Sequence, residues 1–229
     1  MSRGLLLAAH GSHESAAQQS TERLAQLVRA ELPGVTVAIG YLDHAEPSVS
    51  DALAALAREA ETVTVVPLLF APGKHVDVDL PAVVAAHPGV TLTAPLGPDP
   101  LVAAALRDRL IESETSADAT VLVVSAGSND PAAARSTEAT ARLLAEGTGW
   151  HVVATSANAD IPLVVAEARS GDGTVAVSPL LLAPGSFAER IAAAAYAGGA
   201  DIVAEPIADH PAIALLVAKR FAASTQVAA

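Results

Sequence analysis

Short apolar runs rich in Val, Leu and Ile alternate along the chain with longer Ala-rich stretches that carry apolar residues at helical spacing. The runs predict strands near residues 4–9, 35–41, 62–69, 90–94, 119–125, 151–157, 173–180 and 201–204. The intervening stretches predict helices, among them 14–31, 48–60, 98–112, 131–146, 187–197 and 210–223. Strands that are apolar throughout are typical of parallel sheets covered on both faces. We therefore predict the α/β fold class, with flavodoxin-like units that each hold a four-stranded parallel sheet flanked by helices.

The same pattern occurs twice. The paired segments, in order, are LLLAAHGS (5–12) with VLVVSAGS (121–128), PLLFAPGKH (67–75) with PLLLAPGSF (179–187), and PLGPDP (95–100) with PIADHP (206–211). A repeat that preserves turns and apolar strands needs them for the fold. We expect two similar lobes, residues 1–115 and 116–229, that meet at a short polar join.

The two copies differ in their chemistry. His10 and His75 of the first copy are replaced by Ala126 and Phe187 in the second. Each histidine alone has an ordinary explanation, as a turn residue or as the polar start of the helix after Pro72-Gly73. Both follow predicted strands, however, and parallel sheets place ligand sites at the carboxyl ends of their strands. Because neutral imidazole binds divalent metal or accepts a proton, we predict a site in the first lobe only.

A third group follows the second predicted strand, in the segment YLDHAEPS. Asp43 is the preferred carboxylate for a metal or a proton, because neighbouring strand residues point to opposite faces and only one of Asp43 and His44 can face the site. Glu46 is explained equally well as a helix N-terminal charge. His13 is expected to be a solvated surface residue. Three further histidines are expected to be structural or incidental, namely His87, His151 and His210.

Polar residues near the same strand ends are candidates for holding a substrate. Lys74 is either a surface charge or a partner for an anionic ligand at the opening of a helix. Ser12, Ser128 and Ser186 complete the predicted substrate-binding set, with the last two from the second copy. Ser125 and Asn158 of the second copy are also polar but unreactive.

The composition of the chain disfavours several classes of function. The 229 residues are 52% hydrophobic and carry a formal net charge of −12, which disfavours binding to nucleic acid or to an anionic membrane. The chain has no cysteine, which excludes disulfides and thiolate chemistry. No apolar run approaches the ~20 residues of a membrane span, and no signal peptide is expected at the start. A cytoplasmic enzyme is the simplest prediction.

At these residues the chain resembles the sirohydrochlorin chelatases, the class II chelatases that insert iron or cobalt into a modified tetrapyrrole. The resemblance is carried by LLLAAHGS with His10, YLDHAEPS, PLLFAPGKHVDVDLP with His75 and PLGPDPLVAAALRDRL, and the second-half copies extend it over nearly the whole chain. The family frequently has glutamate where this chain has Asp43, so Glu46 and His44 stay open as alternatives for the third group of the site.

The resemblance implies two chelatase-like lobes, no permanently bound cofactor and a monomer. It implies that His10 and His75 handle the metal and accept protons, and it adds Asp43 to the metal-binding and catalytic set. The metal enters as a substrate, with Fe2+ expected first and Co2+ or Ni2+ as alternatives, and sirohydrochlorin is the partner. A non-catalytic metal-delivery protein stays open as the second hypothesis. A histidine phosphatase is disfavoured, because Ala9 stands where that class has arginine.

Overall fold

The computed structural model describes residues 2–169 and 171–227, which form two compact units. Unit 1 comprises Met1–Leu96 with Ala208–Ala229, and unit 2 comprises Gly97–Ile207. Each unit contains one four-stranded sheet, and every strand pairing within the two sheets is parallel. The predicted fold class is therefore confirmed.

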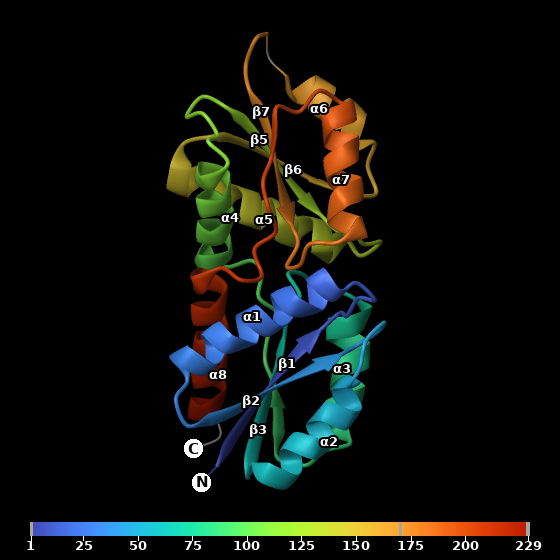
Figure 1. The fold of residues 1–229 in the computed structure, drawn as a ribbon, viewed down its shortest axis with the longest axis vertical. Coiled ribbons are helices and arrows are strands. Elements are labelled where there is room, and N and C mark those ends of the chain that lie inside the picture. The colour runs from blue at the N-terminus through green and yellow to red at the C-terminus, as the bar shows by residue number, and fades with distance from the viewer. Residues whose placement is uncertain (1, 170, 228–229) are drawn as a thin grey trace. The chain divides into compact units, whose positions relative to one another are not determined.

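Unit 1 has the strand order β2-β1-β3-β4, of which β1, β2 and β3 are labelled in Figure 1. Its strands are β1 (Arg3–Ala9), β2 (Val35–Tyr41), β3 (Thr62–Pro67) and β4 (Val90–Leu92). Its helices are α1 (Ser15–Glu31), α2 (Val49–Glu59), α3 (Leu80–Ala85) and α8 (Pro211–Val227), and a π-helical turn, η1 (His75–Asp79), leads into α3. Because every crossover is parallel, the carboxyl ends of the strands meet at one edge.

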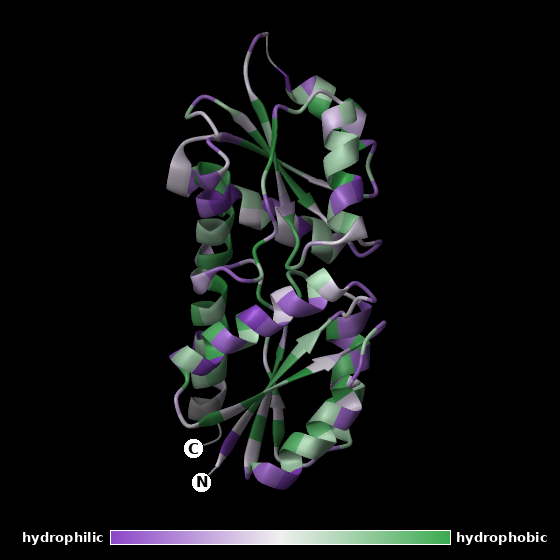
Figure 2. Cartoon of the chain, in the orientation of Figure 1, coloured by the Kyte–Doolittle hydropathy of each residue, from purple (hydrophilic) through white to green (hydrophobic). Residues whose placement is uncertain are grey.

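Strand β1, one of the two inner strands of the unit 1 sheet, is buried on both faces. On one face, Leu6 and Ala8 of β1 pack with Leu53 and Leu56 of α2, and Leu80 of α3 joins the same core. Alternate β1 side chains point to the other face, which α1 and α8 cover. In Figure 2 most of β1 is coloured as hydrophobic, whereas α1 alternates between hydrophilic and hydrophobic segments. The continuous apolar sequence of the strand follows from this double covering.

Unit 2 repeats the arrangement with the strand order β6-β5-β7-β8. Its strands are β5 (Thr120–Ser125), β6 (His151–Ser156), β7 (Val175–Leu180) and β8 (Ile202–Val203), and its helices are α4 (Pro100–Glu112), α5 (Pro131–Thr148), α6 (Ile161–Ala168) and α7 (Ser186–Ala197). Helix α6 was not among the helices named from the sequence, although it has clear start signals. The Asp160 carboxylate accepts a hydrogen bond from the Leu163 amide (3.2 Å), and Pro162 lies in the first turn.

The unit boundaries differ from the expected lobes 1–115 and 116–229. Helix α4 belongs to unit 2, where it packs against α5 and β7, and α8 belongs to unit 1, where it packs against α1 and β3. Each sequence repeat thus contributes its last helix to the other unit. The repeat pattern could not reveal this exchange, because a helix carries the same amphipathic signal whichever sheet it covers.

Among the described residues, no helix has both the length and the apolar character that crossing a membrane requires.

Candidate active site

Backbone hydrogen bonds join the loops that follow β1 and β2. The Leu42 amide donates to the Ala9 carbonyl (2.9 Å), and the Asp43 amide donates to the His10 carbonyl (2.8 Å). Gly11 has a φ of 100°, and a Cβ at this position would lie 1.7 Å from the Asp43 carbonyl oxygen. Only glycine permits this approach. The dipeptide His10-Gly11 therefore holds the side chain of His10 next to that of Asp43.

Tyr41 ends β2 beneath these loops and is 8% exposed. Burial, with a smaller contribution from the charge on Glu22, raises the pKa of Tyr41 above its usual value. The phenol is therefore neutral in the physiological range and does not supply a charge to the site.

His75 is positioned by the turn after β3. The Gly73 carbonyl accepts bonds from the amides of Val76 (2.9 Å) and Asp77 (2.8 Å), and this begins η1. His75 Nδ1 lies 2.8 Å from Asp79 Oδ2, four residues further on. An ionised carboxylate only accepts hydrogen bonds, so in the neutral imidazole beside it Nδ1 carries the proton and Nε2 keeps its lone pair. The Asp79 contact thus selects the tautomer of His75 that can bind a metal through Nε2.

Three potential metal ligands meet at this edge of unit 1. His10, Asp43 and His75 each offer one ligand atom, and these atoms lie within 4.8 Å of one another. His75 Nε2 is 3.8 Å from Asp43 Oδ2, and the His10 and His75 rings meet edge to face with centroids 5.1 Å apart. His75 is 28% exposed and Asp43 is 52% exposed, so the group is open to an incoming ion. Two imidazoles and a carboxylate suit iron(II), cobalt(II) or nickel(II).

The other candidates of the YLDHAEPS segment lie outside this triad. Glu46 Oε2 accepts the Ser48 amide at 3.0 Å, so its carboxylate stabilises the start of α2. The His44 ring lies beside the His10 ring, at 5.9 Å between centroids, and close to His13. Asp43 is thus the residue of this segment that the structure brings to both His10 and His75.

The predicted substrate-binding residues of the first copy lie near the triad but have local interactions. Ser12 Oγ accepts the Glu14 amide at 3.1 Å just before α1. Lys74 is 80% exposed, and its Nζ lies 3.9 Å from Asp79 Oδ2.

The sequence analysis did not predict the contact between Asp79 and His75. The signal was the spacing of four residues in a segment expected to be helical, which places both side chains on one face.

Among its described residues, unit 2 lacks the triad at the equivalent edge. Ala126 and Phe187 occupy the positions of His10 and His75, as expected. The strand registers also align Asn158 with Asp43, and a Cβ on Gly127 would contact the Asn158 side chain, just as one on Gly11 would contact Asp43. All three ligands are therefore replaced while the turns are kept.

Two more residues of the predicted set lie at this edge of unit 2. Ser128 Oγ accepts the Asp130 amide at 3.1 Å, and Ser186 begins α7. The guanidinium carbon of Arg190 lies 4.9 Å from the centre of the Phe187 ring, which is a cation–π geometry.

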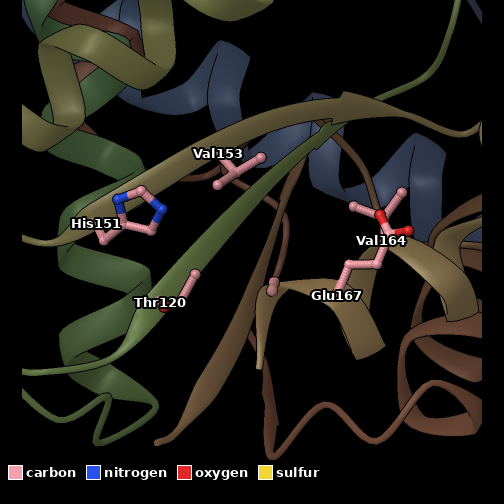
Figure 3. A pocket seen from close by; sticks show the side chains of 6 residues that line it. Thr120, His151, Val153, Val164 and Glu167 are labelled. Carbon is pink, nitrogen blue, oxygen red and sulfur yellow. The ribbon is translucent and has the colours of Figure 1, made fainter. Parts of the chain in front are cut away.

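A pocket lies elsewhere on unit 2, where β5 and β6 begin (Figure 3). Thr120, His151, Val153, Val164, Glu167 and Ala168 line it. It holds one imidazole and one carboxylate and lies away from the carboxyl ends of the strands, where parallel sheets bind ligands. We assign the site to the triad of unit 1.

The fold is a duplicated parallel α/β fold, and the two imidazoles and one carboxylate at one strand edge are the kind of ligand set that metal-handling proteins use. The CbiX family model matches residues 4–113 and 120–224. The chain therefore belongs to the CbiX family.

Curated relatives agree with this assignment. The chain is 27% identical to a sirohydrochlorin ferrochelatase of Bacillus subtilis, over 83% of this chain and 78% of the relative. It is 34% identical to a sirohydrochlorin cobaltochelatase of Sulfurisphaera tokodaii, over 48% of this chain and 92% of the relative. It is 29% identical to a chloroplastic sirohydrochlorin ferrochelatase of Arabidopsis thaliana, but there the match spans 55% of this chain and only 60% of the relative.

A solved structure agrees as well. The structure of SirB from Bacillus subtilis with Fe3+ superimposes with a TM-score of 0.83 at 25% identity, over 97% of this chain and 95% of that one.

Proposed function

We propose that this protein is a sirohydrochlorin chelatase, which inserts a divalent metal ion into the macrocycle and releases two pyrrole protons. The observation that carries the proposal is the meeting of His10, Asp43 and His75 at one strand edge of a CbiX-family chain. The two similar units in one chain support a monomeric enzyme. That it works without a permanently bound cofactor is part of the proposal and follows from the resemblance to the chelatases.

The ligand set suits a metal that must be released again. Three side chains occupy three positions around the ion and leave the others for water or for pyrrole nitrogens. None of the ligands is a thiolate, and the side chains of His10 and Asp43 are exposed. Such a set binds divalent ions more weakly than the closed four-ligand sites that hold structural zinc. Transfer to four macrocycle nitrogens is then favourable.

Proton and metal exchange at the same imidazole atoms balances the reaction. Insertion breaks two pyrrole N–H bonds and forms bonds from the macrocycle to one divalent ion. A ring nitrogen that coordinates the ion cannot accept a proton, but it can do so as soon as the ion leaves. His10 and His75 therefore release one dication and take up two protons. Asp43 stabilises the two imidazolium rings that result.

The carboxylates of the tetrapyrrole require hydrogen-bond donors and positive charge. Lys74, adjacent to His75, supplies an ammonium group, and the hydroxyls of Ser12, Ser128 and Ser186 are further proposed contacts. The protein is acidic overall, with a net charge of −12, so recognition depends on such local donors and on the amides at helix N-termini.

The metal preference is not fixed by the ligand set. Imidazole and carboxylate accept iron(II), cobalt(II) and nickel(II), and the relatives include both ferrochelatases and cobaltochelatases. The expectation that iron is the physiological metal stays a prediction. Comparing kcat/KM for iron(II) and cobalt(II) under anaerobic conditions tests it directly.

The central test is to mix purified protein with sirohydrochlorin and cobalt(II) and to follow the absorption change of the macrocycle. We expect His10→Ala and His75→Ala each to lower kcat/KM at least about 100-fold, because each removes a ligand and a proton acceptor. His151→Ala, an exposed histidine of unit 2, is the matched control and should behave as wild type. Full activity in both triad variants with unchanged circular dichroism would place the site elsewhere. A wild-type protein that binds cobalt(II) without accelerating insertion would instead be the delivery protein.

A further inference from the structure

A second pair of histidines extends the metal site outward along the surface of unit 1. The His44 ring centroid lies 5.9 Å from that of His10, and the His13 centroid lies 5.0 Å from that of His44. With the 5.1 Å step between His10 and His75, four imidazoles form a continuous row. His13 and His44 are both exposed and lie outside the triad.

The local backbone places both rings. His44 adopts a φ of 60°, so its side chain leaves the loop in a different direction from that of Asp43. His13 lies between Ser12 and α1, in a turn closed by the bond from the Glu14 amide to Ser12 Oγ. Gln18 Nε2 also donates to the Ser12 carbonyl at 2.9 Å, which ties the turn to the first helical turns of α1. The pair is therefore built on a fixed turn and an ordered loop.

The spacing of His13 and His44 fits two ligands of one ion. A metal–imidazole bond of about 2.1 Å places the ring centre roughly 3 Å from the metal, so a tetrahedral angle separates two centroids by about 5 Å. The observed separation is 5.0 Å, with the ring planes inclined at 58°. Two neutral imidazoles with water in the remaining positions make a weaker site than the triad, which adds a carboxylate.

We propose that His13 and His44 form an outer binding site for a divalent transition metal, from which the ion passes along His44 and His10 to the triad. Binding at this pair stands on its own geometry, whereas the transfer step depends on the chelatase function proposed above. The ion changes ligands one at a time along the row. It is therefore never released fully into water during loading.

Cobalt(II) binding measured by titration calorimetry and by its visible absorption tests the outer site without any turnover. The double variant His10→Ala/His75→Ala removes two of the three triad ligands and should still bind about one cobalt(II). Adding His13→Gln and His44→Asn should abolish this remaining binding. Asparagine is chosen because it tolerates the positive φ of residue 44. In the same background, His151→Gln is the matched control and should leave the binding unchanged.

Two binding results would overturn the outer site. One is a double variant that binds no cobalt(II) while keeping wild-type circular dichroism. The other is residual binding that survives the loss of both His13 and His44. Neither readout involves sirohydrochlorin, so both stay informative if the chelatase function fails.

Steady-state kinetics test the transfer step. His13→Gln alone should raise the KM for cobalt(II) about five- to tenfold. The accompanying decrease in kcat should be smaller than this. The reason is that this change impairs capture of the ion and leaves the triad intact. An unchanged KM for the metal in an enzyme that is active and binds cobalt(II) at both sites would overturn the transfer step.

Discussion

At the scale of single residues, the chemistry depends on how each ligand is held by its neighbours. His75 Nδ1 contacts Asp79 Oδ2 at 2.8 Å, whereas its Nε2 lies 3.8 Å from the nearest oxygen of Asp43. The shorter contact fixes the ring and its tautomer, and the longer one leaves room for an ion to enter. Asp79 is thus a positioning residue: it holds His75, and it would act on a bound ion only through that ring.

We expect Asp79→Ala to lower kcat/KM about 10-fold or more, the usual cost of losing the carboxylate partner of a metal-ligating histidine. Asp79→Asn should have a smaller effect, because its amide oxygen still accepts the Nδ1 proton. Asp172→Asn, an exposed carboxylate of unit 2, is the control. Cobalt(II) affinity and turnover should be measured for all three. Equal losses in Asp79→Ala and Asp79→Asn would argue against selection of the tautomer.

A second residue-scale prediction concerns the close approach at Gly11. Gly11→Ala introduces a Cβ that would meet the Asp43 carbonyl oxygen at 1.7 Å, so the loop must move and separate His10 from Asp43. We expect a loss of about 3 kcal/mol in the free energy of unfolding, together with most of the activity.

Gly34→Ala is the matched control for this variant. Gly34 also has a positive φ, 82°, but no atom lies within 4 Å of the position that an added Cβ would take. It should therefore cost only about 1–2 kcal/mol, from backbone strain, with normal activity. Urea denaturation and the insertion assay measure both quantities. Equal losses in the two variants would mean that strain, and not the contact with Asp43, determines the effect.

At the scale of elements, one carboxylate of unit 2, that of Asp201, connects the start of β8 to β7 and to the end of α6. Asp201, just before β8, accepts the Val175 amide of β7 at 2.8 Å and pairs with Arg169 after α6 at 2.8 Å. The backbone bond from Val175 is the largest cause of the lowered pKa of Asp201, with Arg169 adding to it against the opposing effect of burial. The ionised form is therefore bound more favourably in the folded protein than in the unfolded chain.

The sign of this linkage gives a pH prediction. A carboxylate whose folded pKa is lowered contributes stability above its unfolded pKa of about 3.9 and loses it as the pH falls through the folded value. Asp201→Asn should thus lower the free energy of unfolding at neutral pH by about 1 kcal/mol, since the group is half exposed and loses charge-assisted bonds. Urea denaturation of both proteins at neutral pH and below pH ~4 should show the difference shrinking in acid. A difference that is constant with pH would contradict this explanation.

At the scale of the whole molecule, each repeat donates its last helix to the other unit. Helix α8 closes unit 1, and Phe221 on α8 is 2% exposed, with the Arg3 guanidinium carbon 5.4 Å from the centre of its ring. The sheet that carries the triad is therefore completed by residues at the far end of the chain. The unit that holds the triad is therefore stabilised by a helix that is far in sequence from His10, Asp43 and His75.

We expect Phe221→Ala to destabilise unit 1 by about 3–5 kcal/mol, because it empties a fully packed position. Tyr196→Ala, in unit 2, removes a ring that is 55% exposed and should cost about 0.5 kcal/mol or less. Thermal unfolding with and without cobalt(II) measures both changes. An unchanged stability in Phe221→Ala would show that α8 does not stabilise the unit that holds the triad.

Predictions from the sequence were accurate where the signal is local. The eight strands lie where the apolar runs placed them, and Ala126 and Phe187 stand at the positions of the histidines in the first copy. Asp43 was chosen over His44 on the rule that adjacent strand residues face opposite ways. The structure brings Asp43 to both triad histidines, but it does so through a loop in which His44 has a positive φ. The choice of Asp43 thus agrees with the structure, but the reason is the loop conformation and not the alternation of side chains along a strand.

The sequence by itself determined the parallel α/β class, the duplication and the difference in chemistry between the two copies, because apolar periodicity and turn residues act over a few positions. Only the tertiary structure decided which sheet α4 and α8 cover and that His13 and His44 meet beside His10. These features depend on distances between segments that are far apart in the chain or joined by irregular loops. Periodicity carries no information about such distances.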